Sequence, residues 1–141
     1  MTGIRRTDID STRDLNRAMT EIETLAASKY ISLTTIKRDG TPVSTPVWLV
    51  RDSDALRVIT QLDSGKVKRI RNVGDVQVAP CDARGRLKGE PVAARAELED
   101  PADTAMTRKL IIRRYGLLGR MMLRGSADKR VGIRITLTPP A

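Results

Sequence analysis

The feature that most constrains the fold is a series of short runs in which apolar and polar side chains alternate, each ending at a turn signal. Residues 30–36 alternate in this way and lead into Asp39-Gly40, a dipeptide that strongly favours a β-hairpin turn. Strands are predicted at residues 30–36, 42–51, 55–62, 76–80, 90–98 and 130–137. Six strands with few helices predict a mostly β fold, an antiparallel barrel, because a sheet that curls leaves fewer exposed edges.

Helices are predicted on the basis of apolar side chains at three- and four-residue spacing. They cover residues 11–27, 64–73 and 102–115, and the last is expected to resume after Gly116 and run through Met122. Residues 1–12 lack periodicity and are expected to form a loose arm. The length of 141 residues predicts a single domain over residues 1–141, since chains of this size normally build one core.

The composition excludes most forms of side-chain catalysis. The chain contains no histidine and a single cysteine, Cys81, so zinc sites, Ser-His-Asp triads and Cys-His pairs are ruled out and no metal site is expected. Only three aromatic residues are present, Tyr30, Trp48 and Tyr115. If the protein is an enzyme, a bound cofactor is therefore expected to supply the chemistry.

The formal net charge of +9 implies either an anionic partner or simply a basic proteome. An anionic partner could be nucleic acid, anionic lipid or a phosphorylated cofactor. Single-stranded nucleic acid is usually stacked on aromatic side chains, which this chain nearly lacks, so no nucleic-acid partner is expected. No window is apolar enough to cross a bilayer and the amino terminus has no signal-peptide pattern, which predicts a cytoplasmic protein. A basic module that binds nucleic acid or a membrane surface stays open as an alternative.

The most informative segment is residues 60–71, where a predicted strand ends and a short basic helix begins. Unpaired N–H groups at a helix amino terminus favour an anion, and the polar and basic residues of this segment would add to that attraction. The residues concerned are Thr60, Ser64, Gly65, Lys66 and Arg69. Together they predict a phosphate site, although a capped, solvated basic helix has the same pattern.

Three blocks of sequence, at 39–48, 58–66 and 72–81, resemble the pyridoxamine-phosphate-oxidase-like split β-barrel superfamily. The chain is most similar to the small actinobacterial enzymes that use the deazaflavin coenzyme F420. The likeness covers about residues 30–98 and, more loosely, the following helix and last strand. It implies a split β-barrel that forms a homodimer with cofactor sites at the subunit interface.

The resemblance also implies roles for individual residues. Thr60, Ser64, Gly65, Lys66 and Arg69 would bind the cofactor phosphate. The strand Ser44-Thr45-Pro46-Val47-Trp48 would run beside the flavin-like ring, and Ala79, Pro80 and Cys81 would close the pocket. The chemistry implied is hydride transfer from reduced F420 to an electron-poor small molecule, for which no catalytic residue is indicated and whose identity the sequence does not give.

One departure from the family pattern bears on the cofactor. Family members that bind FMN carry Arg where this chain has Thr45 and Lys where it has Val50. The loss of both charges disfavours tight FMN binding and favours F420. An FMN-binding protein and a non-catalytic carrier of flavin or F420 remain alternatives.

A second basic segment spans residues 108–124, with no acidic residue from 104 to 127. Its arginines would suit a polyanion, such as the oligoglutamate tail of F420. A membrane-surface helix and a dimer-packing helix with a solvated basic edge give the same pattern.

Overall fold

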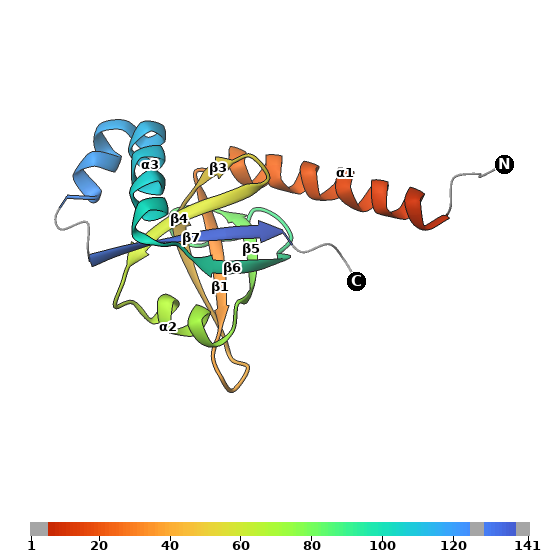
Figure 1. The fold of residues 1–141 in the computed structure, drawn as a ribbon, viewed down its shortest axis with the longest axis horizontal. Coiled ribbons are helices and arrows are strands. Elements are labelled where there is room, and N and C mark those ends of the chain that lie inside the picture. The colour runs from red at the N-terminus through yellow and green to blue at the C-terminus, as the bar shows by residue number, and fades with distance from the viewer. Residues whose placement is uncertain (1–5, 125–128, 138–141) are drawn as a thin grey trace.

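The computed structural model describes residues 6–124 and 129–137, and its elements follow one another as a meander of strands interrupted by helices (Figure 1). In chain order they are α1 (Arg6–Ala27), β1 (Tyr30–Ile36), β2 (Pro42–Trp48), β3 (Val50–Asp52), β4 (Ala55–Gln61), α2 (Gly65–Asn72), β5 (Asp75–Cys81), β6 (Val92–Leu98), α3 (Pro101–Met122) and β7 (Arg130–Leu137). Helix α1 starts at Arg6, so residues 6–12, which were expected in a loose arm, are helical, and residues 1–5 lie outside the described residues.

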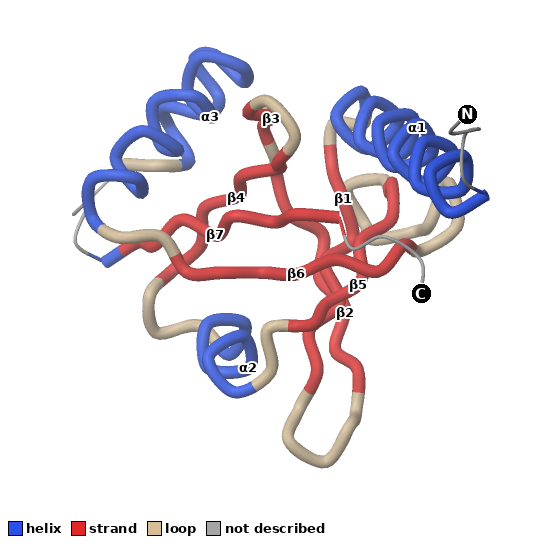
Figure 2. The backbone as a smooth tube through the Cα atoms, turned by 45° about the vertical axis from the view of Figure 1, so that its right-hand side comes forward, coloured by secondary structure: helices blue, strands red, loops and turns tan. Residues whose placement is uncertain are grey.

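All strands pair antiparallel in one sheet of order β2-β1-β5-β6-β7-β4-β3. Its two edge strands, β2 and β3, are separated along the chain by Leu49 alone. The edges of a flat seven-stranded sheet would lie about 29 Å apart, at about 4.8 Å per strand, far beyond the reach of one residue. The sheet must therefore curl, and it forms the half-barrel drawn in Figure 2.

The same junction explains why the sheet has one strand more than the sequence predicts. Residues 42–51 were expected to form one strand, but they divide between β2, which pairs with β1, and β3, which pairs with β4. Leu49 lies at the division and is fully buried. The chain changes partners there, so the sheet has seven strands rather than six.

The inward face of the half-barrel forms the core. Strands β1, β4 and β7 contribute fully buried aliphatic side chains, including Ile31, Leu56 and Ile133. Helix α1 adds Ile22 and Leu25 to this cluster and α2 adds Ile70. The helices are thus fixed to the sheet by burial of their apolar faces, and α2 lies across the sheet from α1 and α3 in Figure 2.

Helix α3 is bent at Gly116, as its sequence predicted. Gly116 has φ +63° and ψ −136°, a conformation that glycine adopts at little cost because it lacks a Cβ. The first part of α3 packs on β4 and β7, whereas the part after Gly116 turns away (Figure 1) and exposes 74% of Leu117. None of the described helices is long and apolar enough to span a membrane.

Candidate functional site

The amino terminus of α2 carries the residues that the sequence predicts as a phosphate site. Strand β4 ends at Gln61, whose carbonyl accepts a hydrogen bond of 3.1 Å from the Ser64 N–H, and this turn starts the helix at Gly65. Ser64 is the N-cap residue, yet its side chain makes no capping hydrogen bond. Its Oγ is buried and has no partner among the described residues. A buried hydroxyl without a partner costs free energy, which a bound acceptor would offset.

Two cations meet at the same helix terminus. The Nε of Arg69 donates a hydrogen bond of 2.6 Å to Oγ1 of Thr35 on β1. The Arg69 side chain lies over Gly65, where a Cβ would come within 2.7 Å of Nη1. Glycine at 65 thus lets the guanidinium approach the helix terminus closely.

Lys66 lies beside this guanidinium. Burial of its ammonium lowers the pKa of Lys66, and the charge of Arg69 lowers it further. No acidic residue stands in the first turn of α2, and the ion pairs between described residues involve neither Lys66 nor Arg69. These two charges and the unpaired N–H groups form a cradle whose chemistry fits a phosphate.

The two strand segments expected to border a cofactor ring lie on either side of β1. Pro46 of β2 and Ala79 of β5 both pair with Ser32, and two residues further along, Trp48 and Cys81 both pair with Tyr30. Direct cross-strand partners share a face of the sheet, so the segments 44–48 and 79–81 are separated by a single strand, about 10 Å. Ser44, Pro46 and Trp48 of β2 therefore share one face of the sheet with Ala79 and Cys81 of β5, whereas Thr45, Val47 and Pro80 lie on the opposite face.

Two hydroxyls on β2 differ in their contacts. Oγ of Ser44 lies 2.6 Å from Oγ1 of Thr34 in an exposed cross-strand hydrogen bond. Oγ1 of Thr45 is buried and, like Oγ of Ser64, has no partner among the described residues. Ser44 is thus satisfied within the sheet, whereas Thr45 keeps hydrogen-bonding capacity for a ligand.

Trp48 makes an aromatic contact that the sequence did not predict. Its ring stacks on Tyr115 of α3, with 4.5 Å between centroids and 7° between planes. The Tyr115 hydroxyl lies 2.8 Å from the carbonyl oxygen of Lys29 and 2.9 Å from that of Leu49, and it accepts the Leu49 N–H at 3.2 Å. Trp48 therefore fixes α3 to the β2–β3 corner, which leaves only part of its surface for a ligand.

Arg114 completes this contact, which we call the α3 clamp: Arg114, Tyr115 and Trp48. The guanidinium of Arg114 donates to the carbonyls of Leu49 at 2.8 Å, Ala26 at 2.8 Å and Ser28 at 2.9 Å. It also lies 5.2 Å from the centroid of the Tyr115 ring. A basic residue of segment 108–124 is thus used for structure rather than for a polyanion.

Cys81 behaves as a packing thiol. It is 1% exposed, and burial, followed by the charge of Asp82, raises the pKa of its thiol. A thiol that is buried and uncharged at neutral pH is a poor nucleophile. Its place in a cofactor pocket would be as part of the wall.

Comparisons with known proteins identify the family and the fold. The family model described as pyridoxamine 5'-phosphate oxidase matches residues 18–137. No curated protein matches the chain. Among solved structures, an F420 reductase is 25% identical, with a TM-score of 0.59, over 82% of this chain and 92% of that one.

Two further solved structures show the same fold at lower identity. A conserved hypothetical protein from Mycobacterium tuberculosis is 24% identical, with a TM-score of 0.63, over 84% of this chain and 79% of the other. A FAD-binding protein from Mesorhizobium loti is 18% identical, with a TM-score of 0.61, over 86% of this chain and 89% of the other.

Proposed function

Because the chain belongs to the pyridoxamine 5'-phosphate oxidase family, we propose that it is an oxidoreductase that uses reduced F420 to reduce an electron-poor small molecule. The observation that carries this proposal is the phosphate cradle at α2. There, within the described part of the chain, the buried Oγ of Ser64 has no hydrogen-bond partner, and neither Lys66 nor Arg69 forms a salt bridge with a carboxylate. The similarity to a solved F420 reductase supports the choice of cofactor.

In this proposal the residues of the chain bind and orient the cofactor. The Ser64 hydroxyl donates a hydrogen bond to a phosphate oxygen. Lys66 and Arg69 offset the phosphate charge beside the helix amino terminus. Thr60, at the end of β4, and Thr45, on β2, add hydroxyls on the way to the ring. When bound, reduced F420 supplies the hydride, so positioning and exclusion of water are the tasks left to the protein.

The choice of F420 over FMN rests on two positions where FMN-binding members are expected to carry cations. Thr45 has a buried hydroxyl without a partner, and Val50 is a partly buried aliphatic residue on the edge strand β3. Neither side chain can pair with the additional negative charge of an FMN phosphomonoester. We therefore expect FMN to bind more weakly than F420.

The proposal includes a cytoplasmic homodimer with cofactor sites at the subunit interface. Strand β2, which carries Thr45 and Trp48, is an edge of the sheet, and Leu117, Leu118 and Met122 are exposed after the kink in α3. Both features offer surface for a second copy. Light scattering coupled to size-exclusion chromatography should give twice the monomer mass of 15.6 kDa, and a monomeric mass would contradict this part.

A fluorescence titration tests cofactor binding. The wild-type protein should bind F420 with a Kd of about 10 μM or below, and Lys66→Ala should weaken binding at least about tenfold, the value of one lost charge-assisted contact. Lys68→Ala is the matched control, since Lys68 is exposed on the same helix. Folded protein that binds no F420 would overturn the proposal, and tighter binding of FMN would favour an FMN-binding protein.

Turnover separates an enzyme from a carrier. The bound reduced cofactor should be oxidised when a panel of nitro compounds, quinones and enones is added. In Lys66→Ala the rate of cofactor oxidation should fall when the cofactor is below saturation. If F420 binds but no member of the panel is reduced faster than without protein, a non-catalytic carrier is the better description.

A further inference from the structure

A cavity of about 650 Å³ lies between α3, the strands β4 and β7, and the carboxyl end of α2. Its volume falls in the range typical of small-molecule sites, roughly 300–1,000 Å³. Much of its wall is apolar, formed by Ile59, Leu62, Leu98, Pro101, Ala105 and Val131. Ser64, Lys66 and Arg69 do not line it, so it is a different place from the phosphate cradle.

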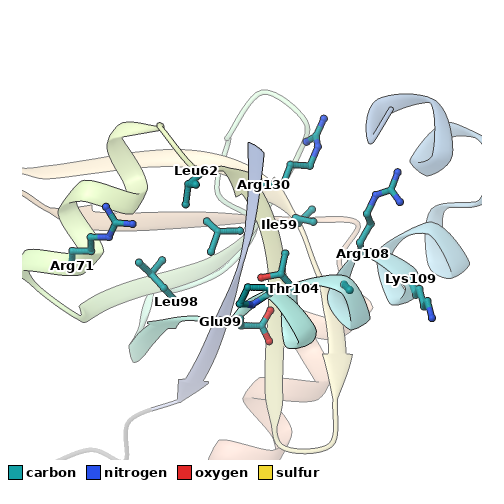
Figure 3. Close-up of a pocket in the computed structure, with 12 residues that line it drawn as sticks. Ile59, Leu62, Arg71, Leu98, Glu99, Thr104, Arg108, Lys109 and Arg130 are labelled. Carbon is teal, nitrogen blue, oxygen red and sulfur yellow. The ribbon is translucent and has the colours of Figure 1, made fainter. Parts of the chain in front are cut away.

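Four cations surround this apolar wall. Figure 3 shows Arg71 on one side, with Arg108 and Lys109 of α3 on the opposite side and Arg130 of β7 between them. Arg71 and Lys109 are exposed, and neither forms a salt bridge among the described residues. Positive charges around the rim of an apolar wall favour a ligand that is both anionic and apolar.

The single carboxylate that lines the cavity is already paired. Glu99 accepts a hydrogen bond from the Thr107 hydroxyl and forms an ion pair with Arg57, with 3.5 Å between Oε2 and Nε. Its side chain is 3% exposed and packs so closely on Gly132 that a Cβ there would overlap it. Arg57 is shared with Asp52, at 3.2 Å between Nε and Oδ2, and Oε2 of Glu99 accepts no hydrogen bond from the described residues. The acidic group of a ligand would therefore have to lie away from Glu99, beside the cations.

Arg108 adds an unused donor. Its Nη2 donates 2.9 Å to the carbonyl of Leu123, which holds the side chain against the last turn of α3. Its Nε is buried and has no partner among the described residues. A buried guanidinium N–H is costly to leave unpaired, so an acceptor in the cavity would be favoured.

We propose that this cavity is a second binding site, which takes a small organic anion with an apolar body and one acidic group. The apolar body would lie on Ile59, Leu98 and Val131, and the acidic group would face Arg108 and Lys109. The site is separate from the phosphate cradle and does not depend on which cofactor binds there.

Calorimetric titration of the full chain with three probes of one shape tests the proposal. The probes are 2-naphthoate, 2-naphthyl phosphate and the neutral 2-naphthamide. Either anion should bind at least about tenfold more tightly than the amide, and the preference should shrink as salt is raised. The tighter of the two anions distinguishes a carboxylate ligand from a phosphate ester.

Variants then locate the binding. Arg71→Gln combined with Lys109→Gln should reduce the preference for the anions about tenfold, because both side chains are exposed and make no ion pair that folding needs. Ala105→Trp should fill the cavity and abolish binding of all three probes. Ala102→Trp is the matched control, since Ala102 is exposed on the same helix and does not line the cavity.

The outcomes separate this site from the proposed cofactor site. Lys66→Ala should bind 2-naphthoate as the wild type does while losing affinity for F420. If Lys66→Ala also loses 2-naphthoate, or if folded Ala105→Trp binds the probes unchanged, the cavity is not the site. No anion preference in the wild type would likewise overturn the proposal.

Discussion

Arg69 and Arg114 are both helical arginines whose side chains reach toward β1 or its flanking residues, and the structure uses them in opposite ways. Arg114 places its N–H groups on the carbonyls of Leu49, Ala26 and Ser28 and lies over Tyr115. Arg69 makes one hydrogen bond, to Thr35, and its remaining N–H groups lie at the amino terminus of α2 beside Lys66. Arg114 thus uses its N–H groups to stabilise the fold, whereas Arg69 has N–H groups left that can donate to a ligand.

The difference shows that basic residues indicate an anion-binding site only where their N–H groups lack hydrogen-bond partners within the protein. Segment 108–124 has a high density of positive charge, yet the structure divides its arginines among separate tasks. Arg114 belongs to the α3 clamp, Arg108 lines the cavity, and Arg113 and Arg120 are exposed next to Leu117. The segment therefore does not form one continuous grip on a polyanion.

The largest expected effect comes from breaking the α3 clamp. Tyr115→Ala removes the stack on Trp48 and the hydrogen bonds at the β2–β3 corner, and it should lower the free energy of unfolding by about 3 kcal/mol. Tyr115→Phe keeps the ring and should cost about 1 kcal/mol. Urea unfolding measures both. Equal stability of the two variants would mean that the stack contributes little.

Replacing each arginine with alanine in a separate variant tests whether Arg114 serves the fold and Arg69 serves the ligand. Arg114→Ala should cost about 2 kcal/mol of stability, because carbonyl groups lose charged donors, and should leave F420 affinity unchanged. Arg69→Ala should cost less than about 1 kcal/mol but weaken F420 about tenfold. Unfolding curves and fluorescence titration on the same samples give both quantities. The opposite pattern would show that the two roles are assigned the wrong way round.

A smaller effect is expected from pH. The pKa of Lys66 is lowered from 10.5 in the free protein, and a bound phosphate would raise it again because it favours the charged form. Above the lowered pKa of the free protein, binding takes up a proton, so affinity for F420 should fall as pH rises through the pKa of free Lys66. Lys66→Arg stays charged and should give a flat profile. An identical decline in both proteins would assign the titration to another group.

The smallest effect on stability is expected at Ser64. Loss of an N-cap serine usually costs about 1 kcal/mol, but this side chain makes no capping hydrogen bond. Ser64→Ala should therefore change stability by less than about 0.5 kcal/mol while weakening F420 about threefold to tenfold. If Ser64→Ala instead lost about 1 kcal/mol of stability with unchanged affinity for F420, Ser64 would be a structural capping residue.

Local patterns predicted the elements well where each residue's partners are close in sequence. The hairpin at Asp39-Gly40 follows from a turn in which Gly40 has φ +90° and the Thr41 N–H bonds the Asp39 carboxylate. The two-part α3 follows from Gly116, and β7 spans residues 130–137 as predicted. In each case neighbours within four residues decide the conformation.

The division of residues 42–51 was not predictable in this way. Both halves alternate as a strand should, and only the pairing of β2 with β1 and of β3 with β4 separates them. The residues expected to bind a phosphate were assigned from a local signal, the strand end and basic helix start at 60–69. That assignment stays a prediction, although Lys66 and Arg69 do meet at the helix terminus.

By itself the sequence determined the kinds of element, their order and the amount of positive charge, because these depend on residue type and short-range spacing. Tertiary structure alone decided which cations are free. The partners of Arg114 lie 65 to 88 residues away, and the stack of Tyr115 on Trp48 joins α3 to the sheet corner. Long-range hydrogen bonds and burial, which local patterns do not show, thus place Arg114 in a clamp, bring Lys66 and Arg69 together at α2 and set four other cations around a separate cavity.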